Sequence, residues 1–204
     1  MSIKYACFIS YPHYSTKYVE TFLDQLKIAL ETSIEPYLNQ IRVVYQDKYN
    51  LEKNIPDEEL TKKLGQAICE SVCWIIIFGP AYQERIWCLR EFMAMEQIEE
   101  KRKQLLGSKY DRLRTMIFPL IIDNKSHIPN KVREISINNF LTYELISQKN
   151  SKSNNTERYL EALARIIYKH FFNLRTLNYN KSTNECTQFK LSSVEDTKKW
   201  WDKT

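Results

Sequence analysis

Short apolar runs alternate along this chain with longer segments in which apolar residues recur at helical spacing. The apolar runs predict strands, over residues 4–10, 41–46, 72–78 and 116–122. The helical spacing predicts helices, over residues 15–31, 58–70, 86–104 and 156–172. A fifth strand, short and weakly patterned, is expected near Ile135 to Leu141. Strands that alternate with helices are typical of an α/β protein with a parallel sheet.

The apolar run at residues 72–78 is followed by two residues that could belong to a ligand site, Trp87 and Glu91. Residues 72–78 are apolar throughout, which is typical of a strand covered on both faces, and the Gly-Pro pair after them ends it. The next helix is expected to begin near Ile86, so Glu91 lies over the carboxyl end of a strand, where open α/β sheets bind ligands. Trp87 precedes it by one helical turn on the same face. The alternative is that Glu91 is a solvated helix residue and Trp87 a packing residue.

The predicted first strand also ends in polar side chains. Ser10 and Tyr11 close the run Phe8-Ile9-Ser10-Tyr11, and His13 follows them. The Ser10 hydroxyl fits two interpretations, a strand-end cap or a contact to a ligand.

These segments, in their order and spacing, resemble the TIR domain family over residues 3–172. The run that ends at Tyr11 is similar to the family's first box, residues 67–71 to its helix before the central strand, and residues 82–91 to its most distinctive segment. The Pro-Gly often seen after the second strand is absent. The resemblance implies a flavodoxin-like three-layer sandwich with a central, mainly parallel five-stranded sheet. We therefore expect a TIR domain over residues 1–172 and a polar tail over 173–204.

The resemblance also implies an activity. Many TIR domains consume NAD, and the family's catalytic Glu falls on Glu91, with the motif Trp on Trp87. The remaining candidates share the expected nucleotide site, and they are Ser10, Tyr11, His13 and Tyr82. A core or loop-packing role would serve Tyr82 equally well. NAD is the substrate in this interpretation, and no cofactor or metal is expected.

A single carboxylate is sufficient for this reaction. Nicotinamide leaves a pyridinium as a neutral base, so no general acid has to protonate it, unlike the leaving group in ordinary glycoside hydrolysis. An ionised Glu that accepts hydrogen bonds from ribose hydroxyls stabilises the oxocarbenium-like charge that develops. Water, the adenine ring or a ribose hydroxyl can each capture that cation, so hydrolase and cyclase products both stay open.

The competing class is a non-enzymatic adaptor, because other TIR domains act through TIR–TIR assembly. The presence of both Trp87 and Glu91 favours the enzyme. In this family a neighbouring protomer often completes the active site, so we expect self-association in either case. The chain further resembles the stand-alone TIR proteins of prokaryotic antiphage systems of the Thoeris kind. That resemblance implies an ADP-ribose-derived signal that acts on a separate effector protein.

Composition limits the number of domains and the kinds of ligand that the chain is expected to bind. A chain of 204 residues, 43% of them hydrophobic, fits one domain, and a net charge of +5 from interspersed charges does not indicate nucleic-acid binding. The local basic stretch at residues 101–103 and 109–114 fits either a solvated helix end or a docking site for a partner or an anionic metabolite. With 3 glycines there is no phosphate-cradling loop.

The cysteines and the apolar runs bear on the expected location. Five cysteines without a CxxC pair argue against a disulfide scaffold or a zinc site, and favour a reducing cytoplasm. The longest apolar run is far shorter than the roughly 20 residues of a membrane helix, so no membrane association is expected. In the tail, Trp200 and Trp201 either pack on the domain or mark a partner contact.

Overall fold

The structure is a computed structural model that describes residues 3–12, 17–38, 42–46, 57–107, 115–121, 128–138, 154–176 and 185–202. Helices and strands alternate along most of this length, as the sequence pattern predicts. Their order is β1 (Tyr5–Ser10), α1 (Lys17–Ile34), β2 (Arg42–Gln46), α2 (Asp57–Cys69), β3 (Ser71–Phe78), α3 (Pro80–Gln83), α4 (Ile86–Leu106), β4 (Ile117–Ile121), α5 (Asn130–Asn138), α7 (Asn154–Thr176), α8 (Glu185–Gln188) and α9 (Val194–Trp201).

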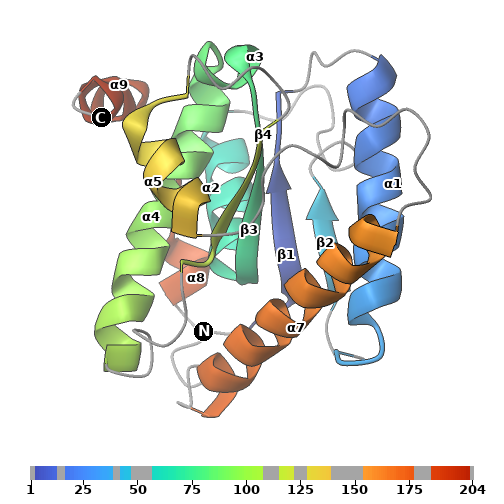
Figure 1. Cartoon of the computed structure of the whole chain (residues 1–204). Helices are drawn as coiled ribbons and strands as arrows, with labels where there is room; N and C mark the ends of the chain where they lie inside the picture. Colours follow the sequence, from blue (N-terminus) through green and yellow to red (C-terminus); the bar gives the residue numbers. More distant parts are fainter. Residues whose placement is uncertain are drawn as a thin grey trace.

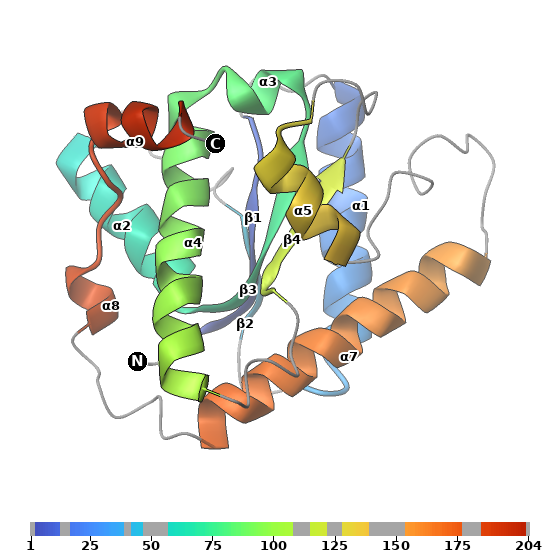
Figure 2. The ribbon, with the colours of Figure 1, turned by 60° about the vertical axis from the view of Figure 1, so that its left-hand side comes forward.

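The sheet is parallel, with strand order β2-β1-β3-β4. In register, Cys7 of β1 lies between Val44 of β2 and Cys73 of β3, while Trp74 of β3 lies opposite Ile117 of β4. Helices cover both faces, with α1 and α7 on one side and α2 and α4 on the other (Figures 1 and 2). The expected α/β class and parallel sheet are therefore confirmed.

The expected fifth strand is wrong within the part of the chain that the structure describes, where the sheet has four strands. Helix α5 occupies residues 130–138, which include the first half of the predicted strand, and residues 139–141 lie outside the described ranges. The physical reason lies in the spacing of three apolar residues. Ile128, Val132 and Ile135 recur at intervals of four and three, and all three pack on the core.

The central strand β3 is the most buried element. All 8 of its residues are buried, which agrees with the prediction of a strand covered on both faces. Full burial of an isoleucine or phenylalanine side chain contributes about 1.5–3 kcal/mol to the stability of the fold, so β3 anchors the layers that pack on it. Its carboxyl end leads through α3 into α4, and this connection delivers Glu91 to the sheet edge.

The C-terminal segment, residues 185–202, packs on the same side as α2 and α4 (Figure 2). Trp200 and Trp201 lie edge-on to the Phe92 ring of α4, with ring centroids 5.6 and 6.4 Å away. The interpretation of this tryptophan pair as a packing anchor is therefore confirmed. No helix in the described ranges is both long and apolar enough to cross a membrane.

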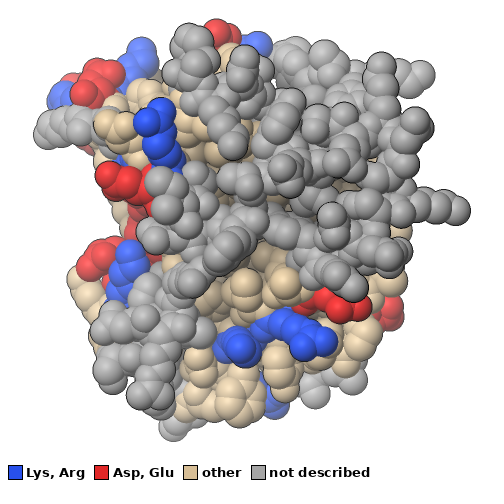
Figure 3. All heavy atoms as spheres, in the orientation of Figure 1, with Lys and Arg blue, Asp and Glu red and all other residues tan. Residues whose placement is uncertain are grey.

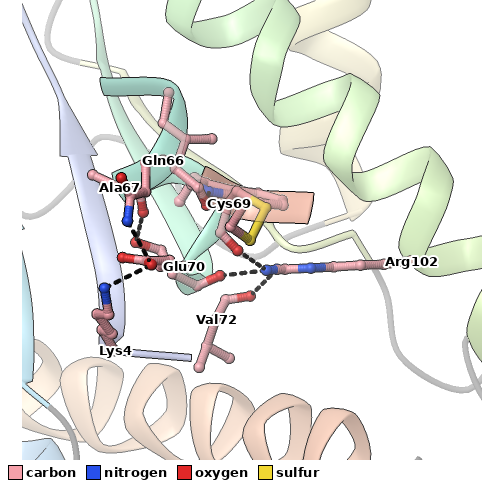
Figure 4. The surroundings of a disulfide bond; sticks show 11 residues. Lys4, Gln66, Ala67, Cys69, Glu70, Val72 and Arg102 are labelled. Atoms are coloured by element: carbon pink, nitrogen blue, oxygen red, sulfur yellow. Dashed lines mark hydrogen bonds and ion pairs between the residues drawn. A yellow bond between two sulfur atoms is a disulfide. The ribbon is translucent and has the colours of Figure 1, made fainter. Parts of the chain in front are cut away.

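A disulfide joins this segment to α2, a feature that the cysteine count did not predict. Cys69 at the end of α2 is bonded to Cys186 of α8, with the two Cα atoms 5.4 Å apart (Figure 4). The two cysteines are separated by 117 positions, so no local spacing signals their pairing. The other cysteines, Cys7, Cys73 and Cys88, are buried thiols.

Candidate active site

Two strand ends and one helix build the candidate site. Ser10 is the last residue of β1 and pairs in register with Ile76, near the carboxyl end of β3. After β3, the short helix α3 contributes Tyr82, and α4 begins at Ile86, as predicted. Glu91 lies in the second turn of α4, so its carboxylate is brought back over the end of β1.

Three of the predicted residues meet in one hydrogen-bonded cluster. The Ser10 hydroxyl donates to Glu91 Oε2 over 2.5 Å, and its oxygen lies 2.8 Å from the Tyr82 hydroxyl. The Tyr82 hydroxyl also lies 3.1 Å from the Cys88 carbonyl oxygen, to which it donates. Exposed fractions are 1% for Ser10, 0% for Tyr82 and 5% for Glu91. The interpretation of Glu91 as a solvated helix residue is therefore wrong.

The cluster has a defined direction of proton donation when Glu91 is ionised. Ser10 has one hydroxyl hydrogen, which goes to the carboxylate, so the single hydroxyl hydrogen of Tyr82 is shared between Ser10 Oγ and the Cys88 carbonyl oxygen. Burial raises the pKa of Tyr82 well above 10, and the nearby Cys88 and Glu91 raise it further, against a lowering by the Ser10 hydrogen bond. Tyr82 therefore remains a neutral donor. Its ring meanwhile packs on Phe78 with centroids 5.5 Å apart, so it serves both packing and the cluster.

Ser10 does not act as a strand-end cap. Both of its side-chain bonds go to other side chains, those of Glu91 and Tyr82. A carboxylate has about four acceptor positions, and the Ser10 bond uses one of them. Ser10 thus holds the carboxylate in one orientation.

Trp87 lies one turn before Glu91 and is partly buried. The Arg90 guanidinium carbon lies 4.3 Å from the centre of its ring, within the range of a cation–π contact. Arg90 Nε in turn donates to the Ser192 carbonyl oxygen over 2.7 Å. Burial lowers the pKa of Arg90 below its usual value, and the charge of Asp57 opposes that shift.

Arg90 is the residue near the site that sequence reasoning did not single out. Its exposed fraction is 7%, which is low for an arginine, and both of its contacts are specific. The available signal was its place beside Glu91 in a stretch whose other residues, from Trp87 to Phe92, are apolar. The partner of its Nε, Ser192, lies in the tail and could not be inferred from spacing.

Cys88 also borders the cluster, but its thiol is not suited to nucleophilic chemistry. Its exposed fraction is 3%, and burial raises the pKa of the thiol, with a further increase from the Glu91 charge. A buried neutral thiol is a poor nucleophile. Among the described residues there is also no group of three or more His, Cys, Asp or Glu side chains that could hold a metal ion.

The other predicted residues lie nearby or outside the described ranges. Tyr11 follows Ser10 directly and is buried, with an exposed fraction of 4%. His13 lies outside the described residues, so its predicted place near the phosphates stays a prediction. A surface hollow of about 570 Å³ lies farther along α4, between residues 96–103 and Phe189, and it does not coincide with Glu91.

The basic stretch near the end of α4 is not a continuous surface patch. Arg102 is fully buried, and its guanidinium donates to the main-chain carbonyls of Val72, Cys69 and Ser71 (Figure 4). This arginine ties α4 to the start of β3 and does not face solvent. The charges at 109–114 lie outside the described ranges.

The architecture and the placement of Glu91 define an α/β domain with an acidic site at the carboxyl edge of a parallel sheet. The sequence model of the TIR domain matches residues 4–106, about half of the chain, and the chain belongs to the TIR domain family. That family includes NAD-cleaving enzymes and adaptors, and its domains commonly self-associate. No curated protein matches the chain. Ser10, Tyr82 and Glu91 lie inside the matched range, whereas the C-terminal segment lies beyond it.

Proposed function

We propose that this protein is an NAD-cleaving TIR enzyme that releases nicotinamide, with Glu91 as its catalytic carboxylate. The observation that supports this most directly is the 2.5 Å hydrogen bond from Ser10 to Glu91 at the carboxyl edge of the sheet. A buried carboxylate on an α/β scaffold at this edge is typical of a ligand site and is costly to keep for packing alone. Adaptor function alone gives no reason to retain it.

In the proposed reaction, Glu91 is ionised and faces the ribose that bears nicotinamide. The bond between ribose C1′ and the pyridinium nitrogen breaks, the bonding electrons leave with nicotinamide, and positive charge develops on the ribose. Glu91 stabilises that charge and accepts hydrogen bonds from the ribose hydroxyls. Ser10 holds the carboxylate in position, and Tyr82 fixes Ser10. Trp87, Tyr11 and His13 complete the proposed nucleotide site.

The second half of the reaction decides the product. Capture of the cation by water gives ADP-ribose, whereas capture by a nucleophile of the same molecule gives a cyclic ADP-ribose. We propose that the product is a signalling nucleotide of antiphage immunity that acts on a separate effector protein, in the cytoplasm. The support for this finer statement is the resemblance to stand-alone prokaryotic TIR proteins described above.

The test compares nicotinamide release by the wild type with that by Glu91→Gln. This substitution keeps the size and the hydrogen-bonding ability of the side chain but removes its charge. Glu100→Gln is the matched control, because Glu100 lies on the same helix and is exposed. We expect release to be lost in Glu91→Gln alone, and mass spectrometry of the second product then separates hydrolysis from cyclisation. Equal release by all three proteins would contradict the proposal.

The alternative function is a TIR adaptor that works through self-association. One surface of the molecule has features of an interface that could serve it. Tyr37, in the turn after α1, packs beside Tyr168 of α7, with ring centroids 5.6 Å apart, and the Phe172 ring lies 6.5 Å from that of Tyr168. All three rings are more than a third exposed, and Lys and Arg side chains gather over the same helix α7 (Figure 3). Contiguous exposed aromatic residues are typical of interfaces.

We therefore propose that a second copy of the chain docks on this face. Phe172→Glu should shift the protein from oligomer to monomer in sedimentation velocity. Loss of assembly together with loss of nicotinamide release would indicate an enzyme that needs assembly. Assembly without nicotinamide release under any condition would favour the adaptor, and an unchanged sedimentation profile would exclude this face.

A further inference from the structure

The C-terminal segment, residues 185–202, contacts α4 on both sides of Glu91 in the sequence. Before it, Arg90 donates to the Ser192 carbonyl, and after it, the Phe92 ring meets the two tail tryptophans. Helix α9 lies beside the N-terminal half of α4 in both ribbon views (Figures 1 and 2). The segment therefore contacts the turn of α4 that carries the catalytic carboxylate.

Contacts with α2 hold the same segment in place. Leu191 N donates to the Thr61 carbonyl over 3.2 Å, and the disulfide from Cys69 fixes α8 about two turns farther along α2. The approach is close at Gly65, where an added Cβ would lie 2.7 Å from the Phe189 carbonyl oxygen. Only glycine allows the main chain of the tail to lie this near to α2.

Arg90 connects this docked segment to the site. Its guanidinium contacts the Trp87 ring on one side and the Ser192 main chain on the other. A planar fork with several donors suits a stacked and hydrogen-bonded position of this kind, whereas a lysine offers a single flexible ammonium group. Loss of the Ser192 contact would free Arg90 and, through it, the Trp87 ring one turn before Glu91.

We infer that residues 185–202 form a positioning element for Glu91 and that Arg90 is its positioning residue. The expected effect on catalysis rests on the proposed function. The expected effect on the conformation of α4 around Glu91 does not. The element lies outside the matched range of the TIR domain, residues 4–106, and supplements it. Arg90 is not a catalytic residue in this scheme, since its contacts are with Trp87 and Ser192.

Two variants interrupt the connection at different points. Gly65→Ala displaces the tail at α2, about one turn from the disulfide and away from the site. Arg90→Lys keeps the positive charge but cannot reproduce the stacked, hydrogen-bonded geometry. Lys199→Ala is the control, because it removes only an exposed ion pair with Glu195 on α9.

Two readouts apply to all variants: the kcat and KM for nicotinamide release, and amide hydrogen exchange over residues 86–92 by mass spectrometry. We expect kcat to fall about 10- to 100-fold in Gly65→Ala and Arg90→Lys, because a displacement of about 1 Å at a reacting group costs this much. KM should stay within about twofold, as expected when a transition-state interaction is lost. Exchange over 86–92 should rise in both variants, and Lys199→Ala should match the wild type in both readouts.

The two proposals can fail separately. If the wild type releases no nicotinamide, the proposed function fails, and hydrogen exchange over residues 86–92 still decides the positioning role. The inference is overturned if Arg90→Lys retains wild-type kcat and wild-type exchange. It is also overturned if Gly65→Ala exposes residues 185–202 to exchange while residues 86–92 stay protected. Should Gly65→Ala not fold, Arg90→Lys alone provides the test.

Discussion

The hydroxyl of Ser10 donates a hydrogen bond to Glu91 Oε2 across 81 positions of sequence. It joins the end of β1 to the second turn of α4, two elements that meet because parallel strands end at one edge of the sheet. Both side chains are almost fully buried. The contact thus fixes the orientation of the one carboxylate on which the proposed chemistry depends.

Ser10→Ala should lower nicotinamide release with little change in KM. The substitution removes the donor from a buried carboxylate, and a hydrogen bond to a charged group is worth about 1.5–3 kcal/mol, or roughly 10- to 150-fold in rate. Ser10→Thr keeps a hydroxyl and should retain most of the activity. Steady-state kinetics of both variants check this. Equal loss in Ser10→Thr and Ser10→Ala would point to packing at residue 10 as the cause.

Arg102→Met should strongly destabilise the fold. The guanidinium lies 4.8 Å from the centre of the Trp74 ring and donates to three main-chain carbonyls over 2.7–3.0 Å. Without the guanidinium, three buried carbonyl oxygens lose a hydrogen-bond donor, so we expect the free energy of unfolding to fall by about 3–5 kcal/mol.

Urea denaturation of Arg102→Met and Lys101→Met measures this difference. Lys101 is the adjacent cation, it is exposed, and its contact with the Phe189 ring spans 5.6 Å. Its removal should cost less than about 1 kcal/mol. Similar losses in the two variants would show that Arg102 does not have the structural role described here.

Reduction of the disulfide should lower thermal stability. The bond between Cys69 and Cys186 closes a long loop, and such a cross-link stabilises a fold by about 2–5 kcal/mol, mainly by restricting the unfolded chain. A reductant should therefore lower the unfolding midpoint of the wild type and leave that of Cys186→Ser unchanged. Equal midpoints for the oxidised and reduced wild type would mean that the cross-link does not contribute.

The sequence pattern was sufficient for the parts of this protein that depend on local periodicity. The strand 72–78 and the start of α4 near Ile86 were predicted because a continuous apolar run and a Gly-Pro stop are local signals. The grouping of Ser10 with Glu91 in one site was implied by the resemblance to TIR domains, and the hydrogen bond between them shows that the two side chains meet. Residues 135–138 were misread because two isoleucines in a polar stretch fit a strand as well as a helix.

Other features depend on contacts that no spacing encodes. Arg102 stands in a run of basic residues that looks solvated, and only the approach of α4 to the start of β3 buries it. The pairing of Cys69 with Cys186 requires the tail to return to α2, as does the need for glycine at position 65. These contacts arise from tertiary packing of the C-terminal segment, which the sequence presented as a polar tail.

His170 of α7 makes stability depend on pH. Its exposed fraction is 1%, and neither ring nitrogen has a hydrogen-bond partner among the described residues. Its pKa is lowered from 6.5 to about 4, mainly by burial and also by the positive charge of Arg102, while Glu99 opposes both. The folded protein therefore holds this imidazole neutral, whereas the unfolded chain binds a proton below about pH 6.5.

Because the unfolded state binds more protons in this window, the free energy of unfolding falls as the pH decreases from about 6.5 to about 4. The full effect is about 3 kcal/mol, since one pKa unit corresponds to about 1.4 kcal/mol. His170→Leu removes the titrating group, so its denaturation curve should lose this part of the pH dependence and keep the part that comes from carboxylates. Urea denaturation of both proteins at pH 7.5, 5.5 and 4 measures the difference, and parallel pH profiles would rule out His170 as the source.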